Sequence, residues 1–84
     1  MVGLNWFVYI VECSDGSLYT GISNNVDSRI KAHNEGKGAK YTKPRLPVKL
    51  LWYQEAGNRS SASKLEYEIK KMKRIDKKKL IVGR

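Results

Sequence analysis

The feature that most constrains the fold is a pair of short apolar segments, residues 6–11 and 17–23, with a turn-forming Ser-Asp-Gly between them. Both segments contain aromatic and β-branched residues, which are enriched in strands. Residues 6–11 are almost continuously apolar, which is typical of a strand buried on both faces and therefore central in its sheet. The two segments together predict an antiparallel β-hairpin.

The length of the turn decides whether the two tyrosines of this hairpin share a face. Side chains alternate along a strand, so a shift of one residue in the register moves each of them to the other face. A two-residue turn would place Tyr9 and Tyr19 on opposite faces. A three-residue turn at 14–16, with Gly16 in the left-handed region, pairs Tyr9 with Gly21 and places both phenols together. We expect the three-residue turn.

A helix is predicted over residues 26–35, because Asn24 and Asn25 are N-cap candidates and Gly36 suits a C-terminal stop. Arg29 and His33 are four residues apart, so they project from neighbouring turns on one side of this helix. We expect both at the edge of its apolar stripe, where the helix meets solvent.

The remaining segments complete an α+β fold. Residues 48–55 predict a third strand, and residues 60–74 predict the longest helix. The apolar stripe of that helix contains Ala62, Leu65, Ile69 and Met72. Residues 80–82 are expected to pack back onto the body. The order β-β-α-β-α, with a short C-terminal helix as a further candidate, predicts one domain over residues 1–84: a three-stranded antiparallel sheet flanked by helices.

Charge is the main compositional signal, with 17 Lys and Arg against 8 Asp and Glu and a net charge of +9. Such an excess either serves solubility alone or indicates a polyanionic partner; for the second interpretation nucleic acid is the main candidate, with salt-dependent affinity. The single cysteine excludes an internal disulfide and favours a reducing, cytoplasmic setting. No apolar run is long enough for a membrane span, and the N-terminus does not resemble a signal peptide.

Several side chains could support chemistry on a phosphate. The phenols of Tyr9 and Tyr19 have an ordinary pKa of about 10, so either needs a nearby cation to act as a base. The planar guanidinium of Arg29 suits a phosphate oxygen, and His33 is the single histidine in the chain. Each of these residues, taken alone, is also compatible with packing or surface exposure.

Glu66 has two structural interpretations and one functional interpretation. It could complete a capping box with Ser63, although Ser60 or Ser61 would also serve as caps, or it could pair with Lys70 at i+4. A partly buried carboxylate at the sheet edge could instead hold Mg²⁺, which often uses one or two protein carboxylates. The sequence contains no zinc-binding Cys/His cluster and no phosphate-binding GxxxxGK[ST] loop.

The combination of Tyr9, Tyr19-Thr20-Gly21, Arg29-x-x-x-His33 and Glu66 resembles the GIY-YIG nuclease superfamily. The resemblance covers nearly the whole chain and is greatest to a small single-domain branch related to the Slx-type structure-specific nucleases. Phe7-Val8-Tyr9 stands in place of Gly-Ile-Tyr, and Thr20 replaces the Ile of Tyr-Ile-Gly. Both tyrosines and Gly21, the structural glycine of the motif, are retained.

The resemblance implies a metal-dependent endonuclease that hydrolyses phosphodiester bonds in DNA, in repair or recombination. It implies that Glu66 holds one Mg²⁺ or Mn²⁺ ion and that Tyr9 or Tyr19 orients or deprotonates the attacking water. Arg29 would stabilise charge on the scissile phosphate, and His33 would assist by proton transfer or by positioning Tyr9. Which tyrosine is the base stays open at this stage.

Two other functions fit the same residues. One is a nucleic-acid-binding module that does not cut, and the other is a subunit that a protein partner activates, with residues 80–82 as a docking patch. Branched or nicked DNA is the expected partner, and RNA is a further candidate. The basic residues expected to contact nucleic acid are Lys37, Lys40, Lys43, Lys70, Lys73 and Lys77.

Overall fold

The computed structural model describes residues 5–83, so the ends of the predicted domain, residues 1–4 and 84, lie outside the described residues. The sheet contains β1 (Trp6–Glu12), β2 (Leu18–Ser23) and β3 (Lys49–Gly57), in the spatial order β2-β1-β3 with antiparallel neighbours. The prediction of β1 as the central strand is therefore confirmed. Its sequence is apolar on both sides because both of its faces are covered.

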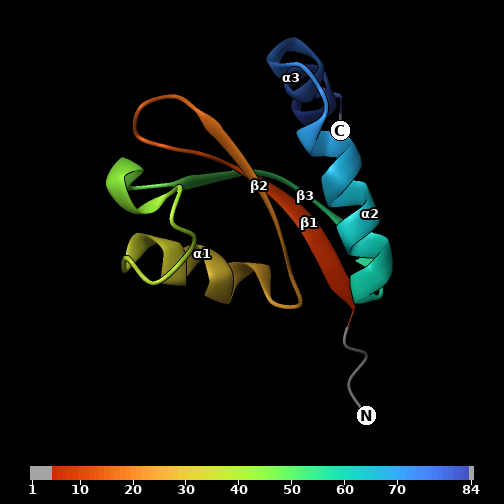
Figure 1. The fold of residues 1–84 in the computed structure, drawn as a ribbon, viewed down its shortest axis with the longest axis horizontal. Helices are drawn as coiled ribbons and strands as arrows, with labels where there is room; N and C mark the ends of the chain where they lie inside the picture. The colour runs from red at the N-terminus through yellow and green to blue at the C-terminus, as the bar shows by residue number, and fades with distance from the viewer. Residues whose placement is uncertain (1–4, 84) are drawn as a thin grey trace.

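Helices lie on both faces of the sheet, as Figure 1 shows. The helices are α1 (Val26–Asn34), α2 (Arg59–Lys70) and α3 (Arg74–Val82), and a short 3₁₀ turn, η1, spans Lys43–Arg45. One face packs Val8 and Ile10 against α2, and the other packs Tyr9 and Val11 toward α1. The predicted α+β class and the predicted order of elements are confirmed, with α3 as the additional helix.

The β1–β2 turn has the predicted three-residue form. Cys13 N–H donates to the Ser17 carbonyl at 2.8 Å, which closes the loop over residues 14–16. Gly16 has φ +85°, a left-handed conformation that glycine adopts without strain. Tyr9 consequently lies opposite Gly21, and both phenols are on the α1 face. Because the turn contains three residues rather than two, Tyr19 and Tyr9 lie on the same face of the sheet.

Both ends of α1 match the sequence signals. The Asn25 side chain accepts a hydrogen bond from Ser28 N–H at the N-terminus. At the C-terminus, Lys37 N–H donates to the Ala32 carbonyl and Gly36 has φ +78°, which is the Schellman pattern. These caps fix the helix at one position in the sequence, so the direction in which Arg29 projects is also fixed.

The predicted long helix over residues 60–74 is wrong in two respects. Helix α2 ends at Lys70, and Met72 lies in the break before α3, 36% exposed, rather than in an apolar stripe. The N-cap is Asn58, whose side chain accepts from Ser61 N–H, so neither a Ser60 or Ser61 cap nor a Ser63 capping box forms.

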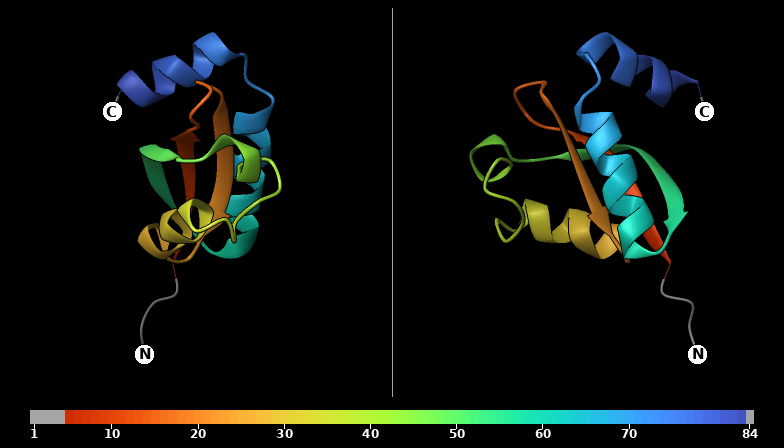
Figure 2. Two further views of the ribbon diagram at one scale, coloured as in Figure 1. Left: turned by 90° about the vertical axis from the view of Figure 1, so that its left-hand side faces the viewer. Right: turned by 45° about the vertical axis from the view of Figure 1, so that its right-hand side comes forward.

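The break after α2 lets α3 cross the end of the sheet near the β1–β2 turn (Figure 2). Leu80 and Ile81 then reach the core, while Val82 is 81% exposed. Residues 80–82 therefore pack back only in part, and the expected apolar docking patch is reduced to the exposed end of α3.

Candidate active site

Four of the five residues predicted to be catalytic or metal-binding, together with the structural glycine Gly21, line one pocket of about 410 Å³ beside β2. Tyr9 comes from β1, Tyr19 and Gly21 from β2, Arg29 from α1 and Glu66 from α2. Helices on opposite faces of the sheet thus contribute to the same pocket. Because β2 is an edge strand, side chains from α1 and α2 can meet beside it without crossing another strand.

Tyr9 is almost completely buried, and Gly21 makes room for its ring. A Cβ atom on Gly21 would lie 2.6 Å from Cζ of Tyr9, far inside van der Waals contact. The glycine is therefore required by the opposing tyrosine rather than by a turn. This contact explains why a Tyr on β1 and a Gly on β2 occur together at paired positions.

His33 is buried behind Tyr9 and does not line the pocket, so the expectation that it lies at a solvent-facing edge is wrong. Its ring meets Tyr9 and Tyr19 edge-on, with centroid distances of 6.0 and 5.6 Å. The loop after α1 covers the other side of the ring, and Gly38 packs so closely on it that a Cβ there would overlap the imidazole. His33 therefore sits in a closed compartment between two phenols and this loop.

Hydrogen bonds assign the proton on His33. The Thr42 hydroxyl has one proton, which it donates to the Ala39 carbonyl at 2.9 Å. The same oxygen is 2.9 Å from Nδ1 of His33, so it accepts a hydrogen bond from Nδ1–H. In the neutral ring, Nε2 is then an acceptor, and it lies 2.8 Å from the Tyr9 hydroxyl. Tyr9 therefore donates its proton to His33.

Burial favours the neutral forms of both groups. Burial and, second, the positive charge of Arg29 lower the pKa of His33. Burial raises the pKa of Tyr9, and the adjacent Arg29 guanidinium partly offsets that rise. The Nε atom of Arg29 is buried and has no hydrogen-bond partner within residues 5–83. An oxygen of a bound molecule could accept a hydrogen bond from this Nε–H, whose desolvation is otherwise uncompensated.

Glu66 is the carboxylate of the pocket, with its side chain 23% exposed. It pairs with Lys70 at 3.3 Å, so the predicted i+4 ion pair is present. The part of the chain that the structure describes holds no cluster of three or more His, Cys, Asp or Glu side chains suited to a metal ion. A divalent cation at Glu66 would therefore take most of its oxygen ligands from water and substrate, which Mg²⁺ accepts.

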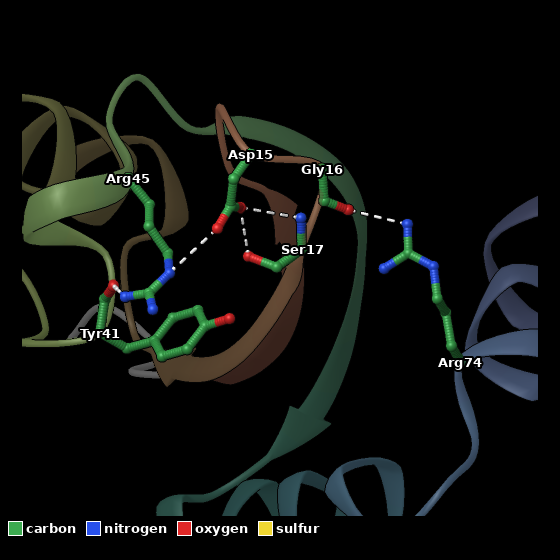
Figure 3. Close-up of polar contacts among 6 residues, drawn as sticks. All are labelled: Asp15, Gly16, Ser17, Tyr41, Arg45 and Arg74. Atoms are coloured by element: carbon green, nitrogen blue, oxygen red, sulfur yellow. Dashed lines mark hydrogen bonds and ion pairs between the residues drawn. The ribbon is translucent and has the colours of Figure 1, made fainter.

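Tyr19 is held in place by contacts outside the pocket. Its ring stacks on Tyr41 with a centroid distance of 6.0 Å and an angle of 16°, and the Arg45 guanidinium lies 4.0 Å from the Tyr41 ring centroid. Figure 3 shows that Arg45 also donates to Asp15 in the β1–β2 turn and to the Tyr41 carbonyl. Hydrogen bonds from Ser17 hold the pKa of Asp15 below its ordinary value, which keeps this anchor ionised.

The α3 helix fixes the other side of the same turn. Arg74, at the start of α3, donates to the Gly16 carbonyl at 2.8 Å (Figure 3). The turn is thus held between Arg45 and Arg74, which come from distant parts of the sequence. These contacts restrain the strand that carries Tyr19.

A second, smaller hollow of about 290 Å³ adjoins the pocket at Tyr19, and it is lined by Lys70 and Lys77 together with Leu18, Thr20 and Tyr41. Two of the six predicted basic contact residues therefore lie next to the pocket. The other four, Lys37, Lys40, Lys43 and Lys73, are exposed and line neither hollow. Lys37 also makes a solvent-exposed ion pair with Glu35.

Sequence reasoning missed Arg59 and Trp6, which line the pocket, and Thr42, which orients His33. Arg59 is seven residues before Glu66, or about two helical turns, so both project from one side of α2. That spacing could have identified Arg59. Thr42 carries no comparable signal, because its role depends on how a loop folds over His33.

Comparison with known proteins agrees with this geometry at the level of class. The family model described as "GIY-YIG catalytic domain" matches residues 5–79. That superfamily consists of nucleases, which typically use divalent metal ions.

Relatives with this small size narrow the assignment. The UPF0213 protein SH2523 of Staphylococcus haemolyticus is 53% identical over 78 residues, covering 93% of this chain and 95% of that protein. A UPF0213 protein of Staphylococcus aureus strain Mu3 is 54% identical with the same coverage. The chain belongs to the UPF0213 family of GIY-YIG proteins.

Two solved structures share the fold. The solution NMR structure of the UPF0213 protein BH0048 from Bacillus halodurans is 45% identical, with a TM-score of 0.62, covering 95% of this chain and 85% of that one. The solution NMR structure of EF2693 from E. faecalis is 33% identical, with a TM-score of 0.63 and coverage of 94% and 84%. Among the described residues, no helix is long and apolar enough to span a membrane.

Proposed function

We propose that this protein is a divalent-metal-dependent endonuclease that hydrolyses phosphodiester bonds in DNA. The observation that carries the proposal is the convergence of Tyr9, Tyr19, Arg29 and Glu66 on one pocket, with a proton acceptor for Tyr9 behind it. The net charge of +9 supports a polyanionic substrate.

Tyr9 is the proposed base, because it has a route for its own proton. The phenol oxygen would take a proton from the attacking water while its hydroxyl proton moves to Nε2 of His33, 2.8 Å away. The resulting hydroxide would attack phosphorus, and the bond to the leaving oxygen would break with its electron pair staying on that oxygen, which then takes a proton from solvent. Tyr19 lacks a hydrogen bond of this kind among the described residues and is proposed to orient the water.

Arg29 and Glu66 have complementary roles in this proposal. The guanidinium of Arg29, with its buried Nε available, would bind a nonbridging oxygen of the scissile phosphate and stabilise the charge that develops there. Glu66 would hold the cation, which supplies Lewis-acid stabilisation of the phosphate when bound. Release of Glu66 from Lys70 would accompany cation binding, since both cations compete for one carboxylate.

Cleavage assays with labelled branched, nicked and linear DNA, with Mg²⁺ or Mn²⁺, test this proposal. Glu66→Gln and Arg29→Ala should each reduce the rate by at least about a hundredfold, as is common when a transition-state contact is removed. Lys64→Ala is the matched control, because Lys64 is an exposed cation of α2 that lines neither hollow. Cleavage that survives Glu66→Gln would overturn the metal role, and a parallel set of RNA substrates tests the choice of DNA.

The Glu66–Lys70 ion pair favours one alternative, a nucleic-acid-binding module whose carboxylate is neutralised by lysine. This alternative predicts salt-dependent binding without turnover at every metal concentration. A partner-activated nuclease would instead begin to cut when the partner is added, so cleavage measured with and without cell extract separates the two.

A further inference from the structure

The pocket that contains Tyr9, Arg29 and Glu66, called the catalytic pocket below, and the smaller hollow follow one another along β2. The catalytic pocket is lined by the C-terminal half of the strand, including Gly21 and Ser23, and the smaller hollow by the N-terminal half, including Leu18. Tyr19 lines both. Because β2 has a neighbour on one side only, this row of hollows lies along one of the two free edges of the sheet.

Arg59 supplies an uncommitted positive charge at one end of the row. Its guanidinium lies 5.4 Å from the Trp6 ring centroid, a cation–π contact that orients it, and both residues line the catalytic pocket. Within residues 5–83, Arg59 takes part in no ion pair. It is therefore available to an anion that binds beside Arg29.

Lys77 supplies a positive charge that is available to an anion at the other end of the row of hollows. It is half-buried on α3 and lines the smaller hollow with Lys70, and no acidic side chain lines that hollow. Lys70 already pairs with Glu66, whereas Lys77 has no ion pair in the described part of the chain. A phosphate in the smaller hollow would therefore meet Lys77 without an opposing carboxylate.

We infer that one strand of the nucleic acid lies along the edge of β2, with the scissile phosphate between Arg29 and Glu66 and the flanking phosphates bound by Arg59 on one side and Lys77 on the other. This inference rests on the proposed function and adds the path of the substrate. Because cations flank the catalytic groups on both sides, the site requires nucleotides on both sides of the cut bond. The protein then cleaves internal bonds and uses chain ends poorly.

Single neutral linkages in the substrate test this path. A methylphosphonate placed next to the cut bond removes one phosphate charge, and products mapped at nucleotide resolution report kcat/KM for the adjacent bond. We expect about a tenfold loss for a neutral linkage on either side, the size of one charge-assisted hydrogen bond. Arg59→Ala should abolish the sensitivity on one side and Lys77→Ala the sensitivity on the other, while Lys64→Ala retains both.

The outcomes separate this inference from the proposed function. If the DNA is cut but neutral linkages have no effect, or if Arg59→Ala and Lys77→Ala retain both sensitivities, the path is wrong and the nuclease assignment stands. If nothing is cut, the nuclease assignment fails and binding tests the path. Arg59→Ala and Lys77→Ala should then each reduce the slope of log affinity against log salt concentration for a single strand by about 0.7, the value of one phosphate contact. Slopes equal to that of the unmodified protein would overturn the path.

Discussion

The hydroxyl oxygen of Tyr9 lies 2.8 Å from Nε2 of His33, and both side chains are buried. The phenol therefore has its proton acceptor inside the protein, on a residue that does not line the pocket. Burial raises the pKa of Tyr9, so its phenol is rarely ionised and is a poor proton acceptor by itself. A neutral imidazole behind it removes that difficulty, because the tyrosine can take one proton as it gives up another.

The state of His33 predicts the pH dependence of both activity and stability. Its pKa is lowered from 6.5 in the folded chain, so cleavage should persist below pH 6.5 and fall as His33 becomes protonated. The folded chain then binds fewer protons than the unfolded chain, so the free energy of unfolding also decreases as the pH falls below 6.5. Rate profiles and urea unfolding between pH 4 and 8 measure both. Stability that rises on acidification would contradict the burial of a neutral His33.

Thr42 is predicted to position the proton on His33. Thr42→Val removes the acceptor of Nδ1–H, so the ring should populate the other tautomer, which ¹⁵N chemical shifts of His33 report directly. Thr42→Ser keeps the hydroxyl and should preserve both the tautomer and the acid limb of the rate profile. Unchanged shifts in Thr42→Val would rule out this role.

Lys70 is predicted to compete with the divalent cation for Glu66. Lys70→Gln should tighten Mn²⁺ binding about two- to fivefold, consistent with the modest value of a partly exposed ion pair. Calorimetric titration of the metal alone gives this change without an activity assay, and Glu66→Gln should abolish the heat. Lys64→Gln serves as the charge-matched control. Equal affinities for Lys70→Gln and Lys64→Gln would show that the pair does not limit cation binding.

Gly21→Ala should destabilise the fold by about 1–3 kcal/mol, because the new methyl group would overlap the Tyr9 ring. Urea unfolding measures the loss. In the double variant with Tyr9→Ala, the second substitution removes the overlap. The free energy lost in the double variant should therefore be smaller than the sum of the losses in the two single variants. Additive losses would mean that the glycine is required for another reason.

Thr20→Val should stabilise the fold by about 1 kcal/mol. The Thr20 hydroxyl is buried and has no hydrogen-bond partner within residues 5–83, so its desolvation is not compensated. Thr42→Val is the opposite case, since its hydroxyl serves two hydrogen bonds and its loss should be destabilising. Thermal unfolding of the two variants gives the comparison, and a destabilised Thr20→Val would indicate a bound water or ligand at that hydroxyl.

The elements that local patterns specify could be predicted, and those that depend on distant packing could not. The three-residue turn followed from Gly16 and from strand alternation, and α1 followed from its caps. The end of α2 at Lys70 had no such signal, since the apolar spacing continues through Met72. The chain turns there because Leu80 and Ile81 gain burial against the core when α3 crosses the sheet.

The candidate site also contains residues that could be predicted from the sequence and residues that could not. Tyr9, Tyr19, Arg29 and Glu66 are candidates from their types and spacing, the resemblance to the GIY-YIG motifs groups them as a site, and the structure brings them to one pocket. The burial of His33 could not be predicted, because it requires a loop from beyond α1 to place Gly38 and Thr42 on the imidazole. Long-range closure of this kind leaves no periodic pattern in the sequence.

The turn at residues 14–16 also limits how the chain can change in length. Inserting or deleting one residue there would transfer Tyr19 to the α2 face and leave Tyr9 without its partner. A two-residue insertion would restore the alternation, at the cost of the contacts from Arg45 and Arg74 to the turn. The hairpin should therefore tolerate a change of two residues in the length of its turn better than a change of one.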